Sequence, residues 1–129
     1  MGKHSSETPR GDLTLRTLAM PSDANAAGDI FGGWVMAQMD LACGIRAAEH
    51  AGGRVVTAAV NEMVFEKPMH VGDTLCVYTH IDRVGRTSMT LIVEAWAQRY
   101  LKPDREKVIV GRFVMVALDG DGKPVPIET

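Results

Sequence analysis

The segment Pro21–Asp40, PSDANAAGDIFGGWVMAQMD, contains the residues whose types and spacing are best suited to chemistry. A polar loop with Asn25 leads into Gly32 and Gly33, and a carboxylate, Asp40, follows two helical turns later. The first turn of a helix carries unpaired N–H groups and the positive end of the helix dipole, and glycine lets a ligand carbonyl approach them closely. The segment therefore predicts a site where backbone amides polarise a carbonyl beside a carboxylate.

Asp40 is the first catalytic candidate. At about 100° per residue it points away from Gln38 and Glu49 and lies in line with Cys43 and Ala47, on the most apolar face of the helix. Partial desolvation there would raise the basicity of the carboxylate. We therefore expect Asp40 to act as a general base or as a nucleophile towards an activated carbonyl.

Each of these residues also has a purely structural interpretation. Asp40 could be a buried carboxylate that the backbone or Arg46 satisfies. Asn25 could be a turn residue or a helix cap. Gly32 and Gly33 could reflect only the geometry of a helix start. The residue pattern alone leaves these alternatives open.

A second polar segment, GRTS at residues 85–88, could bind a phosphate group. The chain has neither GxGxxG nor GxxxxGK[ST], so a nucleotide would have to be held by other means. Gly85 permits a bulge or a kink, Arg86 offers a fork of donors, and Thr87 and Ser88 add hydroxyls. The alternative is an ordinary junction between two strands with an exposed arginine.

Histidine and cysteine are placed unfavourably for metal binding. The four histidines stand in separate segments, at His4, His50, His70 and His80. Cys43 and Cys76 lack CxxC spacing and lie in apolar stretches, so we expect two small buried thiols. The pattern disfavours a metal site, a disulfide framework and Ser-His-Asp chemistry.

One helix and several strands must position these groups. An Ala- and Met-rich stretch predicts a helix over Gly32–His50 that ends at Gly52–Gly53. Val-, Ile-, Thr- and aromatic-rich stretches predict strands at Leu13–Leu18, Arg54–Lys67, Thr74–Val84, Arg86–Tyr100 and Lys107–Asp119. The order β-α-β-β-β-β is typical of an α+β fold, in which one helix covers one face of a sheet. Apolar residues occur at both odd and even positions of these strands. This indicates that a second copy of the chain buries the apolar surface that the helix does not cover.

Length and composition limit the classes of protein that fit. The 129 residues, with 46% apolar and 23% charged, predict one domain at 13–119, between a flexible N-terminal tail at 1–12 and a C-terminal tail at 120–129. A formal charge of −2 disfavours a nucleic-acid partner. The polar N-terminus and the absence of a long apolar run predict no membrane association and a cytoplasmic location.

The stretch LRTLAMPSDANAAGDIFGGWVMAQMDLA strongly resembles the bacterial YciA-type acyl-CoA thioesterases of the hotdog fold. The resemblance continues through GRVVTAAVNEMVFEKPMHVGD and VGRTS and covers roughly residues 15–118. It implies a long central helix wrapped by an antiparallel sheet, and a homo-oligomer built as a trimer of hotdog dimers. It also implies hydrolysis of acyl-CoA to a free acid and CoA at the dimer interface, without a separate cofactor.

The same resemblance implies roles for individual residues. Asp40 matches the catalytic carboxylate, Asn25 matches an asparagine that completes the site from the opposite subunit, and the Gly33 amide would polarise the thioester carbonyl. Contacts with the substrate and CoA are implied for Gly32, Val64, Phe65, Lys67, Pro68, Gly85, Arg86, Thr87 and Ser88.

Two other functions remain as alternatives at this point. A hotdog hydratase or dehydratase pairs a histidine with an acid, and no histidine lies between Pro21 and Glu49. A non-catalytic acyl-CoA-binding or regulatory module would use the same pocket without turnover. The sequence predicts neither the preferred acyl-chain length nor which of its two possible roles Asp40 takes.

Overall fold

The computed structural model describes residues 7–127 and contains one long helix and a five-stranded sheet. Its elements are, in chain order, β1 (Asp12–Leu18), the 3-10 turn η1 (Pro21–Asp23), α1 (Gly32–Ala51), β2 (Val55–Phe65), β3 (Thr74–Val84), β4 (Ser88–Gln98) and β5 (Arg105–Ala117). The predicted order of strands and helix is confirmed. The main differences are the 3-10 turn inside the predicted loop, a β4 that is two residues shorter than predicted at each end, and a β5 that begins and ends two residues earlier than predicted.

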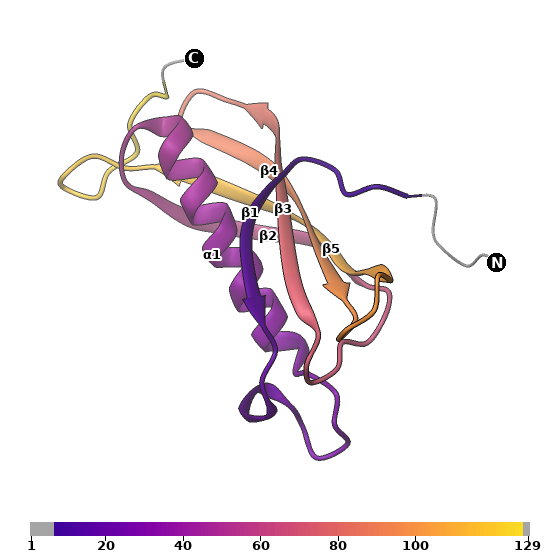
Figure 1. The fold of residues 1–129 in the computed structure, drawn as a ribbon. Helices are drawn as coiled ribbons and strands as arrows, with labels where there is room; N and C mark the ends of the chain where they lie inside the picture. Colours follow the sequence, from indigo (N-terminus) through magenta and orange to yellow (C-terminus); the bar gives the residue numbers. More distant parts are fainter. Residues whose placement is uncertain (1–6, 128–129) are drawn as a thin grey trace.

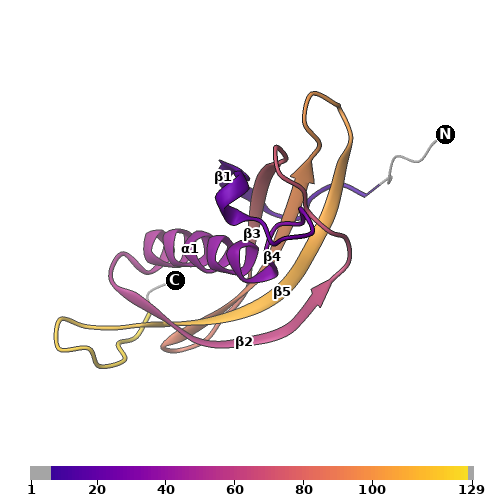
Figure 2. The same cartoon turned by 90° about the horizontal axis from the view of Figure 1, so that it is seen from below.

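The sheet is antiparallel, has the strand order β1-β3-β4-β5-β2, and curves around α1 (Figures 1 and 2). β2 is an edge strand that pairs only with β5. Along this pair, Val55 lies opposite Ala117 and Phe65 lies opposite Ile109. These two pairings lie at opposite ends of the β2–β5 ladder.

The helix forms because its sequence is rich in alanine, methionine and leucine, and it ends where Gly52 adopts a left-handed conformation with φ 71°. One side of α1 packs against the sheet through Val35, Met39, Ala42, Cys43 and Ala47. The facing residues of the sheet include Leu75, Val77, Leu91, Val93, Phe113 and Met115, which complete the core. Burial of this stripe holds the first turn of α1 against the end of β2.

Apolar side chains also lie outside this core. Leu41 and Ile45 on α1 are 56% and 46% exposed. Val56, Val60 and Val64 are exposed along the β2 edge. The outer side of α1 and the free edge of β2 therefore both carry apolar surface that a single chain does not bury.

Parts of both predicted tails contact the sheet. The Arg10 N–H donates to Glu94 Oε1 at 3.1 Å, and after β5 the Ile127 N–H donates to the Arg86 carbonyl at 2.8 Å. The Asp119 carboxylate accepts the N–H groups of Lys123 and Asp121, which lowers its pKa. Residues 1–6 and 128–129 of the predicted tails lie outside the described residues.

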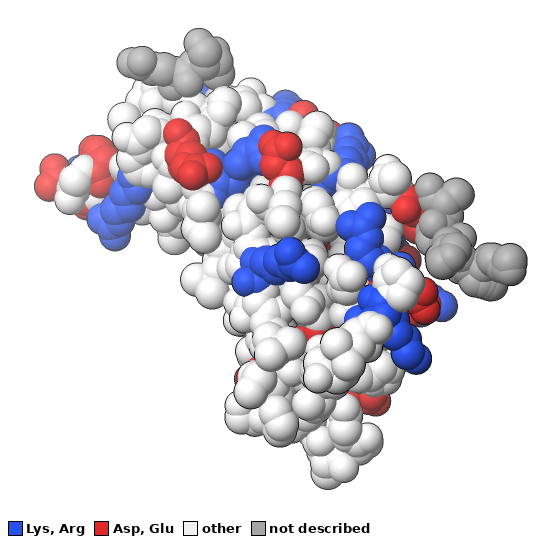
Figure 3. All heavy atoms as spheres, viewed as in Figure 1, with Lys and Arg blue, Asp and Glu red and all other residues white. Residues whose placement is uncertain are grey.

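The surface carries charges of both signs. On the face seen in Figure 3, lysine and arginine side chains are interspersed with aspartate and glutamate, without a broad basic area. Within residues 7–127, α1 and the 3-10 turn are either too short or too polar to cross a bilayer.

Candidate active site

Asp40 is held by a residue that the sequence analysis missed. The Thr57 hydroxyl, on β2, donates a hydrogen bond to Asp40 Oδ1 at 2.5 Å and lies 3.5 Å from Met115 Sδ. Thr57 can reach α1 because β2 returns along the helix directly after Gly52. No motif marks this threonine, because the contact depends on the register of β2 against β5.

The predicted burial of Asp40 is wrong for the single chain. Cys43 and Ala47 are fully buried, whereas Asp40 is exposed. The centre of the buried stripe lies near Met39, and Asp40 is displaced from it by about 100° around the helix. Asp40 thus lies at the border between the core face of α1 and its outer face.

Arg46, one of the two structural partners considered for Asp40, binds other residues instead. Its Nη1 atom lies 2.9 Å from Asp12 Oδ2 and donates to the Thr79 carbonyl at 3.0 Å. Arg46 therefore ties α1 to β1 and β3.

The first turn of α1 has donors that no capping side chain occupies. Phe31 is the N-cap residue and makes no side-chain cap. The N–H groups of Gly32 and Gly33 consequently lack an intrahelical acceptor. A Cβ atom added at Gly33 would meet nothing within 4 Å, whereas one at Gly32 would lie 2.9 Å from Phe65 Cε2. Gly32 thus admits the Phe65 ring, and Gly33 leaves open space over its backbone.

Asn25 is a turn residue, which is one of the two structural interpretations that its position allowed. Its Oδ1 atom accepts the N–H groups of Ala27 at 2.9 Å and Asp29 at 3.1 Å. Asp29 in turn lies 3.2 Å from Nδ1 of His70. The turn uses the carboxamide oxygen of Asn25 and does not use its Nδ2 amide, so a second role for this side chain is compatible with the first.

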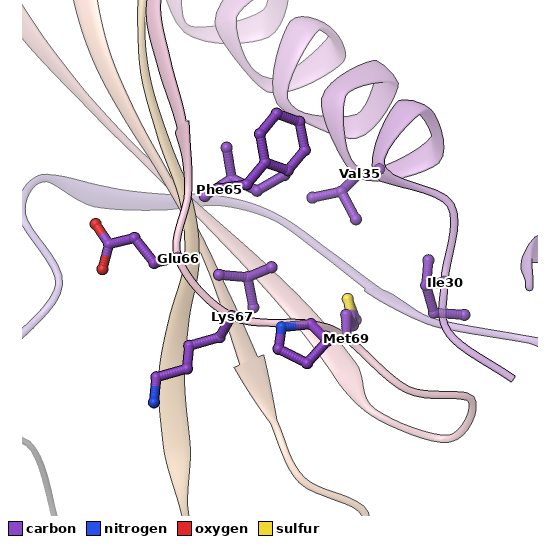
Figure 4. Close-up of a pocket in the computed structure, with 10 residues that line it drawn as sticks. Ile30, Val35, Phe65, Glu66, Lys67 and Met69 are labelled. Atoms are coloured by element: carbon purple, nitrogen blue, oxygen red, sulfur yellow. The ribbon is translucent and has the colours of Figure 1, made fainter. Parts of the chain in front are cut away.

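A cavity of about 350 Å³ opens beside the helix start. In Figure 4, Phe65 and Val35 face one another across it, while the side chains of Glu66 and Lys67 point away from the helix. Its lining residues are Ile30, Gly32, Val35, Phe65, Glu66, Lys67, Pro68, Met69, Val108 and Ile109. Four of the predicted substrate-binding residues are brought together here, namely Gly32, Phe65, Lys67 and Pro68, and Val64 lies beside them on the exposed edge of β2.

The GRTS segment lies at the other end of the sheet. The Ala117 N–H donates to the Thr87 carbonyl at 2.9 Å, whereas Phe65 pairs with Ile109. Eight residues of β5 separate these positions, which corresponds to about 26 Å. A single chain therefore does not bring residues 85–88 and residues 64–68 together.

Gly33 and Asp40 are also too far apart to act on one carbonyl from the same helix. Seven residues separate them, or about 10 Å along the axis. An N–H···O bond, a C=O bond and an attack distance together span at most about 7 Å. Asp40 and the Gly33 amide of one chain therefore cannot both act on the same carbonyl.

The metal-ligating side chains of the described residues are dispersed, and the two cysteines are buried. Within residues 7–127, no group of three or more His, Cys, Asp or Glu side chains is placed to hold a metal ion. Cys43 and Cys76 are free and buried, as predicted. Burial raises the pKa of the Cys43 thiol strongly, and the nearby Asp40 charge raises it further.

Comparisons with known proteins identify the family. The thioesterase superfamily matches residues 27–102. The acyl-CoA thioester hydrolase YciA of Salmonella typhimurium is 48% identical over 123 residues, which cover 93% of this chain and 92% of that protein. The hexameric thioesterase of Yersinia pestis is 46% identical, with a TM-score of 0.91 over 95% of this chain and 100% of that chain. A hexameric broad-specificity acyl-coenzyme A thioesterase is 47% identical, with a TM-score of 0.89 over 95% of this chain and 85% of that one. The helix wrapped by its sheet is thus the predicted hotdog fold, and the chain belongs to the YciA-type branch of the thioesterase superfamily.

Proposed function

We propose that this protein hydrolyses acyl-CoA thioesters to a free acid and CoA. The observation that carries the proposal is the exposed Asp40 carboxylate, held by Thr57 at the border of the outer face of α1. Relatives that match more than nine-tenths of the chain carry the names acyl-CoA thioester hydrolase and acyl-coenzyme A thioesterase. A carboxylate in this position suits attack, directly or through water, on a carbonyl carbon.

The active site is formed between two copies of the chain. Gly33, Ala37 and Leu41 follow one another along the exposed face of α1, and the first two are small enough for a second helix to approach. A two-fold axis near Ala37 places Asp40 of one copy beside the Gly33 amide of an antiparallel partner helix. The exposed apolar residues of α1 and β2 supply the surface for this contact.

The same axis also unites the two binding segments. In each chain, Phe65 lies at the start of α1 and Thr87 lies near its end, because β2 begins directly after the helix. Antiparallel helices therefore bring residues 85–88 of one copy towards residues 64–68 of the other. Since the similar thioesterases are described as hexameric, we propose a trimer of such dimers.

In the proposed mechanism, the thioester oxygen accepts the Gly33 N–H at the positive end of the α1 dipole. Thr57 fixes one oxygen of Asp40, and the other takes a proton from water. The water oxygen forms a bond with the carbonyl carbon, the C–S bond breaks, and the proton passes to the CoA sulfur. In the alternative route Asp40 attacks the carbon itself, the C–S bond breaks and the CoA thiolate leaves, and water then hydrolyses the anhydride and supplies the proton to the sulfur. Asn25 orients the water or the substrate.

The remaining contacts divide the substrate into apolar and charged parts. The cavity between Phe65 and Val35 accommodates an apolar portion next to the helix start. Lys67 and Arg86, both exposed, are placed to meet the phosphates of CoA at the rim. Water is the only other reactant, so the proposal requires no cofactor. We propose that the protein acts in the cytoplasm, which suits its two unpaired cysteines.

The test is thiol release from acyl-CoAs of short to long chain length, followed with a chromogenic disulfide. Wild type is compared with Asp40→Ala and Asp40→Asn, and light scattering checks that the assembly is preserved. We expect thiol release by the wild type and its loss in both variants, with CoA still bound. A wild type that binds CoA and turns over no acyl-CoA would instead be a binding module.

Oxygen-18 water under single-turnover conditions separates the two routes. Label in the Asp40 carboxylate would establish the anhydride route, because simple base catalysis places the label only in the released acid.

A further inference from the structure

Arg99, just after β4, bridges three separate segments of the chain. Its side chain is only 17% exposed. Nη1 donates to Asp73 Oδ2 at 2.5 Å, and Nη2 donates to Glu106 on β5 and to the Pro68 carbonyl at 3.3 Å. The bond from Arg99 lowers the pKa of the Glu106 carboxyl, so this pair is charged over the neutral range.

Asp73 extends these contacts to the turn before β3. Its side chain is 4% exposed, and its Oδ2 atom also accepts the His70 N–H at 2.9 Å. Arg99 and Asp73 together therefore hold the segment 68–70 at two backbone groups, the Pro68 carbonyl and the His70 amide. Neither Arg99 nor Asp73 belongs to a sequence motif that indicates chemistry, and the proposed mechanism uses neither of them.

The segment held in this way forms part of the proposed site. Pro68 and Met69 line the cavity beside the helix start. The Met69 carbonyl accepts the Ile30 N–H at 2.8 Å, and His70 pairs with Asp29, the residue that closes the Asn25 turn. The position of this segment consequently sets both one wall of the cavity and the backbone that residues 29–30, at the end of the Asn25 turn, bind to.

We propose that Arg99 is a positioning residue for acyl-CoA binding, which holds the segment 68–70, and with it the cavity wall at Pro68 and Met69, through Asp73 and the Pro68 carbonyl. This inference rests on the proposed thioesterase function. The guanidinium is suited to the task because its planar fork binds several acceptors in fixed directions, which a lysine ammonium does not. A nearly buried ion pair adds little net stability, and an apolar pair of similar volume would close the hairpin equally well. Net stability therefore does not explain the Arg99–Asp73 ion pair, whereas the fixed position that it gives to the cavity wall does.

The experiment compares wild type with Arg99→Lys and with the double variant Arg99→Met/Asp73→Asn. The double variant removes the bridge without leaving Asp73 as an unpaired buried charge, so that it can still fold. Arg112→Met is the matched control, because Arg112 also joins two carboxylates, Glu62 and Asp82 at 2.9 Å each, and neither of them belongs to the segment 66–70. The readouts are kcat and KM for one acyl-CoA, the Kd of CoA by calorimetry, and the Tm.

The double variant is expected to raise KM and the Kd of CoA about tenfold, with kcat within about twofold of wild type. Arg99→Lys should give intermediate values, and Arg112→Met should leave KM unchanged. A double variant with a lower Tm and wild-type KM and Kd would overturn the inference. A wild type without thiol release refutes the thioesterase proposal separately, and the Kd of CoA then still tests the positioning role.

Discussion

The Asp40 carboxylate obtains its surroundings from two elements. Its place at the border of the helix leaves it exposed in one chain, and Thr57 from β2 restricts its orientation. A preorganised carboxylate needs no reorientation when the substrate arrives, so Thr57 should contribute to the rate.

Replacing Thr57 with valine tests that contribution. A hydrogen bond to a charged group is worth about 1.5–3 kcal/mol, so kcat should fall about tenfold to a hundredfold. Thr57→Ser keeps the hydroxyl and should retain most of the activity. Steady-state kinetics on both variants decides the point, and an unchanged kcat in Thr57→Val would show that the bond plays no part in turnover.

The two cysteines should be unreactive in the native protein. Burial raises the pKa of both thiols, and for Cys76 it outweighs the opposing effect of Arg16 and Arg105. Because only the thiolate reacts, a raised pKa lowers the reactive fraction at pH 8. Titration with a chromogenic disulfide should detect neither thiol in native protein and both in guanidinium chloride. Rapid native reaction of either cysteine would contradict this.

At the scale of elements, the helix and the strands were predictable because their signals are local. The glycine pair at 52–53 marks the end of α1, and Val- and Thr-rich stretches mark the strands. Contacts between elements were not predictable in this way. The Thr57–Asp40 and Arg99–Asp73 pairs depend on register and on hairpin position, and no residue spacing along the chain encodes them.

Gly11, the residue before β1, lies close against the backbone of β3. It has φ 95°, and a Cβ atom there would lie 2.2 Å from the Thr79 carbonyl oxygen. Gly11→Ala should lower the free energy of unfolding by at least about 2 kcal/mol, from backbone strain and this clash. Denaturant unfolding at equal protein concentration measures the change. Gly53→Ala is the control, since a Cβ at Gly53 meets nothing within 4 Å and no more than a small change is expected.

At the scale of the whole molecule, the sequence indicated that a second copy was needed, and the structure explains why. Apolar residues on both faces of the strands predicted a second copy of the chain. Only the fold, however, places Gly33 and Asp40 about 10 Å apart on one rigid helix. In the proposed mechanism that separation makes the site of a single chain incomplete. The proposed dimer takes Asn25 and Gly33 from one copy and Asp40 and Thr57 from the other.

Mixed assemblies of two inactive variants test this division of the site. Asp40→Ala and Asn25→Ala chains with different tags are co-expressed, so that they assemble at random, and intact mass spectrometry checks their ratio. A mixed dimer contains one site with both defects and one site with Asp40 and Asn25 intact. Half of the dimers are mixed and half of their sites are intact, so thiol release should reach about one quarter of wild type. If Asn25 acted on Asp40 of its own chain, every site would carry a defect, and the mixture would show only the mean activity of the two parent variants.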